Sequence, residues 1–260
     1  MRIARFAGDD DPRFGVIGDD NGVPTIAVLN GDPLYAGLNL SGQKIPLADV
    51  RLLAPVIPRS KVVCVGRNYA KHAAELGNDV PDEPLIFLKP NTSVIGPGEP
   101  VFYPEQSNDV HFEGELAVVI GRICRDVPAE DAAKVIFGYT VANDVTARDL
   151  QKKDGQWARA KGFDTFCPLG PWIETDFDPS SVQVTTRLGG DVKQDGNTSD
   201  MVFSVPDIIA YVSSFMTLLP GDVILTGTPD GVGPMQVGDE VSVTVEGIGT
   251  LTNTVVSRND

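Results

Sequence analysis

From Lys61 onward the sequence alternates short apolar, β-branched runs with loops rich in glycine and proline. Runs of this length between turn residues are typical of β-strands. The strand-like segments are KVVCVG, EPLIFLKP, FEGELAVVIGR, GYTVAND, SVQVTTRLGG, DVILTGTP and EVSVTVEGIGTLTNTVV. Helical patterns are limited to NYAKHAAELG, PAEDAAKVIFG, TARDLQKK and VPDIIAYVSSFMTLLPG. The sequence therefore predicts a mainly β fold with a few helices.

The first part of the chain also alternates short strand-like runs with turns, over fewer residues. Residues 1–57 alternate the short runs FGVIG and TIAVL with the turns DDNG and NGDP, and then reach the proline-containing APVIPRS. We predict a small β-rich N-terminal domain over residues 1–57 and a larger main domain over residues 58–260.

Charge and composition exclude several kinds of partner. The chain has 36 acidic and 21 basic residues, a net charge of -15, which repels nucleic acid and anionic membranes. No apolar run approaches the roughly 18 residues of a membrane helix, and charges stand where a signal peptide would be apolar. We expect a cytoplasmic protein with neither nucleic-acid nor membrane partners. The cysteines Cys64, Cys124 and Cys167 fit no disulfide framework or metal motif.

The stretch VHFEGELAVVIGR, residues 110–122, places two glutamates two positions apart in an apolar run. Because side chains alternate along a strand, Glu113 and Glu115 are predicted to share one face with His111. Carboxylates so close together in an apolar setting repel each other and lose hydration unless a cation or a shared proton compensates them. The alternative is an edge strand with its acidic face in solvent.

A third carboxylate, Asp144, lies in GYTVANDVTARDLQ, where a predicted strand runs into a predicted helix. A lone aspartate at such a junction is also a common helix N-cap. The three carboxylates, without a Cys/His cluster in ligand spacing, suit a hard cation such as Mg²⁺ or Mn²⁺ and disfavour zinc.

A histidine and a glutamate stand three residues apart in NYAKHAAELG. On a helix His72 and Glu75 would be neighbours on one face. Such a pair can deprotonate water, because the carboxylate fixes the imidazole tautomer and raises its basicity. The alternative is a surface pair, and His111 is expected only to flank the acids as a hydrogen-bonding partner.

Basic residues gather near these motifs although the chain is acidic. They are Arg67, Lys71, Lys89, Arg148, Lys152 and Lys161. A locally positive pocket predicts a small anionic substrate, whereas solvation is the alternative for any single lysine. The loop TGTPDGVGP, residues 226–234, lacks the P-loop and Rossmann spacings. Its amides could approach a substrate carboxylate, or it could be a tight turn only.

Six motifs together resemble the fumarylacetoacetate hydrolase family, in the same order and across roughly residues 61 to 259. They are VGRNYAKHAAELG, IFLKP, HFEGELAVVIG, GYTVANDVTARDLQ, KGFDTFCPLGPW and PGDVILTGTPDGVG. The resemblance implies a mixed, rolled β-sandwich, usually a homodimer, that holds a divalent metal. The first 55 residues match only the general habit of carrying a small N-terminal domain.

The resemblance also implies roles for particular residues. Glu113, Glu115 and Asp144 would be metal ligands. His72 and Glu75, on a short helix that orders over bound ligand, would activate water, and Lys161 would neutralise charge on the substrate. The implied substrate contacts are Arg67, Tyr69, Arg148, Gln151 and Thr228.

The chemistry that these groups suit is the cleavage or rearrangement of a 2-oxo acid with a second carbonyl, through an enolate that the metal stabilises. C–C hydrolysis, decarboxylation and isomerisation all share that enolate. Family members of this length are often described as isomerases or decarboxylases of homoprotocatechuate degradation. The alternatives are an inactive metal-binding member of the fold and a hydrolase that uses Cys64 or Cys167.

Overall fold

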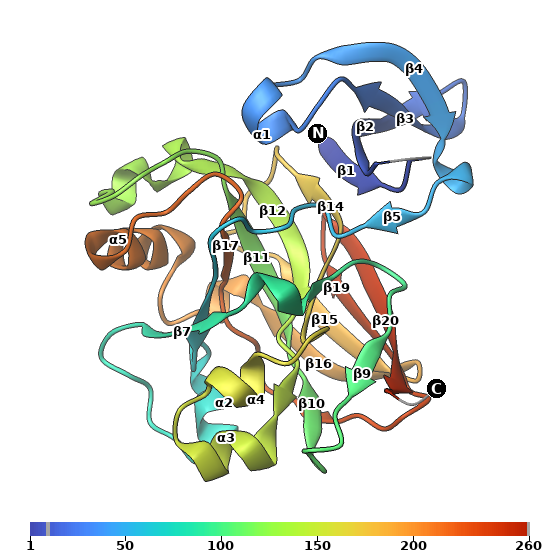
Figure 1. The fold of residues 1–260 in the computed structure, drawn as a ribbon. Helices are drawn as coiled ribbons and strands as arrows, with labels where there is room; N and C mark the ends of the chain where they lie inside the picture. Colours follow the sequence, from blue (N-terminus) through green and yellow to red (C-terminus); the bar gives the residue numbers. More distant parts are fainter. Residues whose placement is uncertain (9–10, 259–260) are drawn as a thin grey trace.

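One long sheet runs through the protein, and the acidic motif described above lies in and beside its central strands. The computed structural model describes residues 1–8 and 11–258, and Figure 1 shows the fold. Along the sheet the strands are β4 (Leu40–Pro46), β3 (Val23–Leu29), β2 (Arg13–Asp20), β1 (Arg2–Phe6), β14 (Cys167–Glu174), β12 (Ile136–Asn143), β11 (Gly114–Ile120), β17 (Val223–Leu225), β6 (Val62–Gly66) and β7 (Leu85–Lys89). The short strands β5 (Leu52–Leu53) and β8 (Val94–Ile95) pair with β1 and β14.

Two smaller sheets and several short helices complete the fold. One sheet has the order β16 (Asp191–Asn197), β15 (Gln183–Leu188), β19 (Glu240–Val245), β20 (Gly249–Ser257) and β9 (Val101–Tyr103), and the other has β13 (Thr146–Ala147), β10 (Val110–Phe112) and β18 (Gly233–Pro234). The α-helices are α1 (Pro33–Ala36), α2 (Ala70–Glu75), α3 (Arg148–Asp154), α4 (Ala158–Lys161) and α5 (Val205–Phe215), and the 3-10 helices are η1 (Leu47–Asp49), η2 (Asn91–Ser93), η3 (Ala129–Lys134) and η4 (Thr198–Asp200). The prediction of a mainly β fold with few helices is confirmed.

The N-terminal strands form a separate lobe in Figure 1, and they also extend the main sheet. Strand β1 pairs antiparallel with β14, where Ile3 lies opposite Ile173. Glu174 at the end of β14 forms ion pairs with the amino terminus and with Arg2. The lobe has its own small apolar core around Phe6 and other residues of β1 and β3.

Strand β11 lies in the middle of the main sheet, with β12 on one side and β17 on the other. Its side chains alternate between two buried clusters: Leu116 and Val118 pack into one, and Ala117 and Val119 into the other. This alternation of faces is the one predicted from the sequence. Because both neighbours are present, the alternative of an edge strand is wrong.

The pairing of β11 with β12 explains why Asp144 meets the two glutamates. Gly114 lies opposite Asn143, so the residues just beyond, Glu113 and Asp144, face each other across the strand ends. The Asp144 amide donates to the Glu113 carbonyl at 2.8 Å, and the Asn143 side chain accepts from the Glu113 amide at 2.9 Å. The predicted single strand is therefore interrupted at Glu113, which separates β10 from β11.

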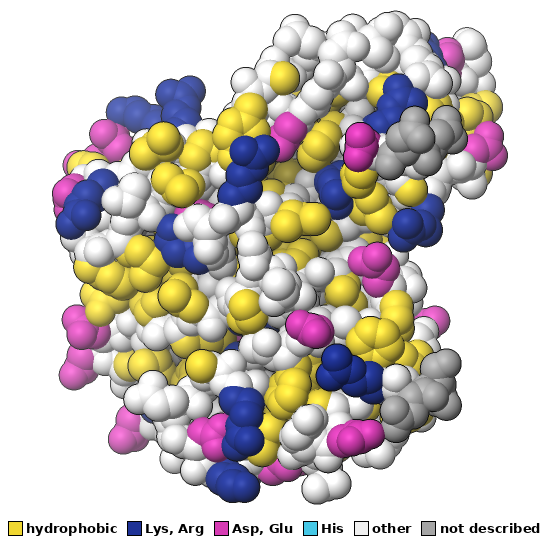
Figure 2. Space-filling model, viewed as in Figure 1, with side chains coloured by type: hydrophobic (Ala, Val, Ile, Leu, Met, Phe, Trp, Pro, Cys, Tyr) yellow, Lys and Arg dark blue, Asp and Glu magenta, His cyan; other side chains and the backbone are white. Residues whose placement is uncertain are grey.

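Some elements differ from the sequence prediction. The segment PAEDAAKVIFG is a 3-10 helix, η3, followed at once by β12, because β-prone residues begin at Ile136. Strand β14 was not predicted, since Pro168 and Pro171 are unusual within a strand. Within residues 1–8 and 11–258, no helix is long and apolar enough to cross a membrane. Acidic and basic side chains are both scattered over the face shown in Figure 2.

Candidate active site

A cavity of about 450 Å³ opens between β6, β7, β10 and the helices α2, α3 and α4. These three helices gather at one end of the molecule in Figure 1. Every site residue predicted from the sequence lines this cavity except Tyr69. The volume lies in the range of small-molecule sites, about 300 to 1,000 Å³.

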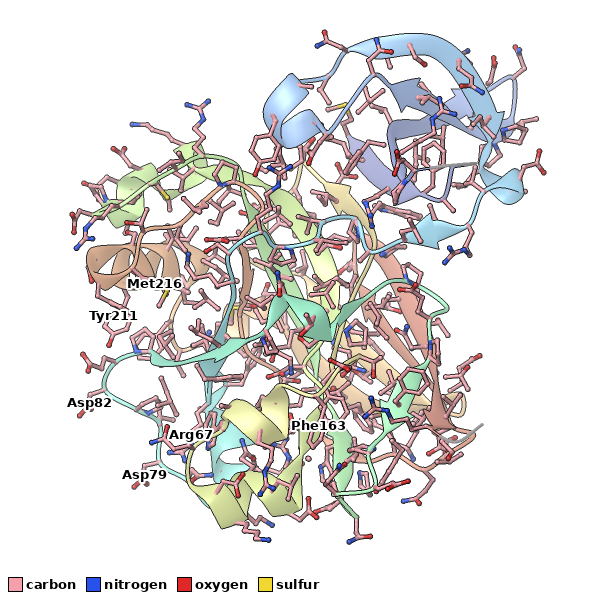
Figure 3. All side chains as sticks on the ribbon, viewed as in Figure 1. Arg67, Asp79, Asp82, Phe163, Tyr211 and Met216 are labelled. Atoms are coloured by element: carbon pink, nitrogen blue, oxygen red, sulfur yellow. The ribbon has the colours of Figure 1, made fainter. Side chains whose placement is uncertain are left out.

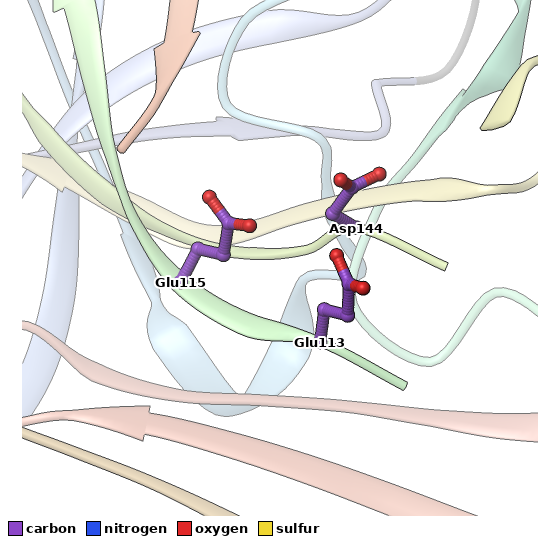
Figure 4. A group of neighbouring side chains, drawn as sticks. All are labelled: Glu113, Glu115 and Asp144. Atoms are coloured by element: carbon purple, nitrogen blue, oxygen red, sulfur yellow. The ribbon is translucent and has the colours of Figure 1, made fainter. Parts of the chain in front are cut away.

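Three carboxylates among the cavity-lining residues lie close together, as Figure 4 shows. One oxygen from each of Glu113, Glu115 and Asp144 lies within 4.8 Å of the other two. All three side chains are buried, with exposures of 4%, 2% and 1%. Three negative charges so close together and out of water require compensation by cations.

Basic side chains supply part of that compensation. Lys161 Nζ lies 2.8 Å from Glu113 Oε2 and 2.5 Å from Asp144 Oδ2, and Arg148 forms an ion pair with Glu113. Burial would raise the pKa of Glu113, but the charges of Arg148 and Lys161 outweigh it and hold this pKa well below its usual range. Burial likewise disfavours the charged Lys161, yet the carboxylates of Asp144 and Glu113 raise its pKa.

Glu115 has a different environment from the other two acids. Its Oε2 accepts a hydrogen bond of 2.7 Å from the Gly227 amide, but among the described residues no basic side chain forms an ion pair with it. Burial, then the charges of Asp144 and Glu113, raise the pKa of Glu115. Three hard oxygen donors, one of them lacking a cation, fit a divalent metal such as Mg²⁺ or Mn²⁺.

His72 and Glu75 form a pair on α2, at the edge of the same cavity. Their Nδ1 and Oε2 atoms are 3.3 Å apart, and His72 is only 5% exposed. The Glu75 carboxylate also accepts from the Gly231 amide at 3.0 Å. His72 is buried and Glu75 is exposed, and both side chains line the cavity.

The glycine-rich loop 226–234 places its amides on protein carboxylates. The Gly227 amide meets Glu115, and the Gly231 amide meets Glu75. Gly231 has φ +95°, and a Cβ there would lie 2.0 Å from the Lys193 carbonyl oxygen. The loop thus connects the acidic cluster with the His72 pair.

The remaining predicted substrate contacts differ in how many hydrogen bonds their side chains form within the protein. Arg148 Nη1 donates to Gln151 Oε1 at 3.0 Å. The Thr228 hydroxyl donates to the Gly114 carbonyl at 2.8 Å and accepts from Gln194 at 2.7 Å. Tyr69 is buried outside the cavity lining, and its hydroxyl has no hydrogen-bond partner among the residues that the structure describes.

Arg67 lines the cavity from a strained backbone conformation. Its φ is +60°, in the left-handed region that residues with a side chain rarely adopt. Figure 3 places it near α2. Backbone strain of this kind clusters at functional sites.

We expect Arg67→Gly to stabilise the fold by about 1 kcal/mol. Glycine removes a penalty of roughly 1–2 kcal/mol for the left-handed backbone conformation. The larger conformational entropy that glycine gives the unfolded chain offsets part of this gain. Urea denaturation measures the difference. Arg67→Ala is the matched control, since alanine removes the guanidinium but keeps the strain. Equal stabilities of the two variants would contradict strain at this position.

Sequence reasoning named Lys89 only as one of the basic residues near the motifs, and it missed Gln194. Lys89 is buried at the end of β7, and its Nζ lies 2.6 Å from Asp144 Oδ1 and 3.1 Å from the Val145 carbonyl oxygen. A lysine at the end of an apolar strand-like run is a signal of a buried ion pair. Gln194 accepts from the Gly114 amide at 2.9 Å, but no local pattern marks it.

The two cysteines considered as nucleophiles lie outside the cavity lining. Cys64 and Cys167 are buried, and neither lines the cavity. Burial raises the pKa of both thiols, that of Cys167 to about 12. A nucleophilic cysteine needs the opposite shift and access to substrate, so the structure gives no support to the cysteine hydrolase alternative.

Comparison with known protein families divides the chain in two parts. Residues 61–256 match the family described as fumarylacetoacetate (FAA) hydrolase, C-terminal. Residues 1–55 match a family described as Rv2993c-like, N-terminal.

Similar proteins include enzymes with different reactions. A solved structure of 5-carboxymethyl-2-hydroxymuconate delta-isomerase from Mycobacterium smegmatis is 54% identical, with a TM-score of 0.92, and the match covers 99% of this chain and all of that one. Human mitochondrial oxaloacetate tautomerase FAHD2A is 48% identical over 82% of this chain and 71% of its own. Maleylpyruvate hydrolase from Sphingobium sp. SYK-6, solved with manganese(II) and pyruvate, is 36% identical, with a TM-score of 0.81 and coverage of 99% of both chains.

Proposed function

The chain belongs to the fumarylacetoacetate hydrolase family, whose members act on oxo acids, and from that membership we propose that it is a metal-dependent tautomerase or isomerase of a small anionic 2-oxo acid. The observation that carries the proposal is the convergence of three buried carboxylates beside the His72 and Glu75 pair in one cavity. The identities of 54% to an isomerase and 48% to a tautomerase favour proton transfer over other reactions of the family.

Glu113, Glu115 and Asp144 would hold Mg²⁺ or Mn²⁺, which when bound supplies electrophilic stabilisation to an oxygen that gains negative charge. The manganese in the maleylpyruvate hydrolase relative supports a divalent ion of this type. Arg148 and Lys161 add positive charge at the same end of the cavity, which favours an anionic substrate.

His72 is the proposed base. Because its Nδ1 faces Glu75, its Nε2 is the nitrogen left to take a proton from the carbon next to the 2-oxo group. The electron pair of that C–H bond forms a C=C bond to the 2-oxo carbon, and the π pair of the C=O bond moves onto the 2-oxo oxygen. The proton then returns to the oxygen in a tautomerase, or to a conjugated carbon in an isomerase.

C–C hydrolysis is the second candidate, and the maleylpyruvate hydrolase relative favours it. In that reaction His72 would deprotonate a water for attack on the distal carbonyl.

The proposed function also includes a homodimer and a cytoplasmic location. It includes neither nucleic-acid nor membrane partners.

The test follows the ultraviolet absorbance of enolic oxaloacetate and of an acylpyruvate over time, in Mn²⁺ or in EDTA. We expect faster ketonisation of oxaloacetate than Mn²⁺ alone gives, with no pyruvate beyond the amount that Mn²⁺ alone produces. Pyruvate released from the acylpyruvate would favour the hydrolase instead. No metal-dependent change with either compound would contradict both functions.

Glu75→Gln is expected to lower turnover by on the order of tenfold, because a general base contributes about 10² to 10⁴ and Glu75 acts through the orientation of His72. The expected change is in kcat, with a smaller effect on KM. Glu130→Gln, an exposed glutamate on η3, removes the same charge away from the cavity. Equal activities of the two variants would show that Glu75 has no role in the reaction.

A further inference from the structure

The cavity lining combines the charged side chains that the proposed chemistry uses, which we call the charged end, with apolar residues that it does not use. The other part of its lining is apolar, and we call Gly66, Phe87 and Trp157 the aromatic wall. The two rings meet edge to face, with centroids 5.2 Å apart and planes at 71°. An apolar wall beside a cluster of charges needs an apolar or conjugated group to cover it.

Gly66 makes room for the indole. A Cβ at this position would lie 2.8 Å from Cζ3 of Trp157, closer than carbon atoms normally approach. The indole therefore lies directly against the backbone at the end of β6. Trp157 is only partly buried, so it keeps an accessible surface in the cavity lining.

Helix α4 connects the aromatic wall with the charged end, because Trp157 precedes the helix and Lys161 is its last residue. The Lys161 amide donates to the Trp157 carbonyl at 3.0 Å, one helical turn earlier. Lys161 Nζ, which contacts Glu113 and Asp144, also lies 4.8 Å from the centroid of the Phe87 ring. A ligand held at the carboxylates would therefore extend along the rings.

We propose that the aromatic wall receives the part of the substrate beyond its 2-oxo acid head, and that Trp157 selects flat, conjugated distal groups over saturated ones. The inference rests on the proposed function, which places the 2-oxo acid head at the charged end. Ring faces stack favourably on planar conjugated groups, and a saturated chain of the same size offers no such face. Trp157 is thus a specificity-determining residue for the enol or diene acids on which the enzyme acts.

The test measures binding, not turnover, by calorimetry in the presence of Mn²⁺. Pyruvate supplies the head alone, phenylpyruvate adds a flat ring, and 3-cyclohexylpyruvate adds a ring of the same size that is not flat. We expect the wild type to bind phenylpyruvate about tenfold more tightly than 3-cyclohexylpyruvate, the size of effect that a favourable aromatic contact gives. Trp157→Ala should remove this preference and leave pyruvate binding within about twofold.

Two further variants keep the test informative if Trp157→Ala does not fold. Trp157→Phe retains a flat ring and should keep most of the preference. Gly66→Ala should push the indole into the cavity and weaken both ringed ligands but not pyruvate. In a Trp172→Phe background Trp157 is the single tryptophan, so phenylpyruvate should change its fluorescence while pyruvate should not.

The outcomes separate the two proposals. If the wild type does not bind pyruvate in Mn²⁺, the proposed function fails and the assignment of the aromatic wall fails with it. If pyruvate binds but phenylpyruvate shows no preference that depends on Trp157, only the aromatic wall is overturned. If Trp157→Ala lowers the affinity for all three ligands by the same factor, Trp157 only supports Lys161. That result also overturns the assignment of the aromatic wall.

Discussion

Glu115→Gln is expected to abolish metal-dependent turnover while leaving the protein folded. Glu115 is the one acid of the cluster that has no ion pair with a basic side chain among the described residues, and its hydrogen-bond partner is the Gly227 amide. A glutamine keeps the shape and can still accept that bond through its amide oxygen. It removes the charge that would attract a divalent ion, so Mn²⁺ affinity should fall by at least about a hundredfold and the activity with it.

Thermal unfolding with and without Mn²⁺ separates loss of the metal from loss of the fold. At a hundredfold excess over Kd, an ion that binds only the folded state stabilises it by about 2.7 kcal/mol, or roughly 5–10 °C in Tm for a protein of this size. We expect this shift in the wild type and none in Glu115→Gln. Glu174→Gln is the control: it alters a buried glutamate at the far end of β14 and should keep the full Mn²⁺ shift. An unchanged shift in Glu115→Gln would contradict its assignment as a metal ligand.

The acidic cluster could be predicted from the sequence because its geometry is local. The strand period of two places Glu113 and Glu115 on one side, and an apolar run indicates that the strand is buried. Asp144 could be singled out as a carboxylate at a strand-to-helix junction, but its contact with the glutamates depends on an antiparallel register that no local pattern specifies. The same holds for the His72 pair, whose spacing is local but whose contact with Gly231 spans the fold.

Other features could not be read from the sequence because they depend on distant contacts. The prolines of β14 make this segment look unlike a strand, although β14 pairs with β1 and joins the N-terminal lobe to the main sheet. The aromatic wall combines Gly66, Phe87 and Trp157 from three separate segments, and a glycine next to an indole has no local signature. Tyr69, two residues after Arg67 in the same motif, lies outside the cavity lining, although the family resemblance implies a substrate contact there.

The charge balance of the cluster identifies Lys89 as a residue with a large structural effect. Three buried carboxylates are matched by three basic side chains: Lys89, Arg148 and Lys161. Lys89 contacts Asp144 but is not part of the cavity lining. Its role is therefore to hold the Asp144 carboxylate and not to bind the substrate. Removing one member of a buried pair is costly, because the remaining charge stays out of water without a partner.

Lys89→Met is therefore expected to lower the free energy of unfolding of the metal-free protein by roughly 3–5 kcal/mol, the usual cost of breaking a buried ion pair. Urea denaturation in EDTA measures it. Lys44→Met is the matched control: Lys44 pairs with Asp20 at the surface, where both side chains are exposed, and its loss should cost less than about 1 kcal/mol. In the double variant Lys89→Met, Asp144→Asn the unpaired charge is gone, so part of the stability should return. If Lys89→Met costs no more than Lys44→Met, Lys161 alone compensates Asp144, and the cluster does not need all three cations.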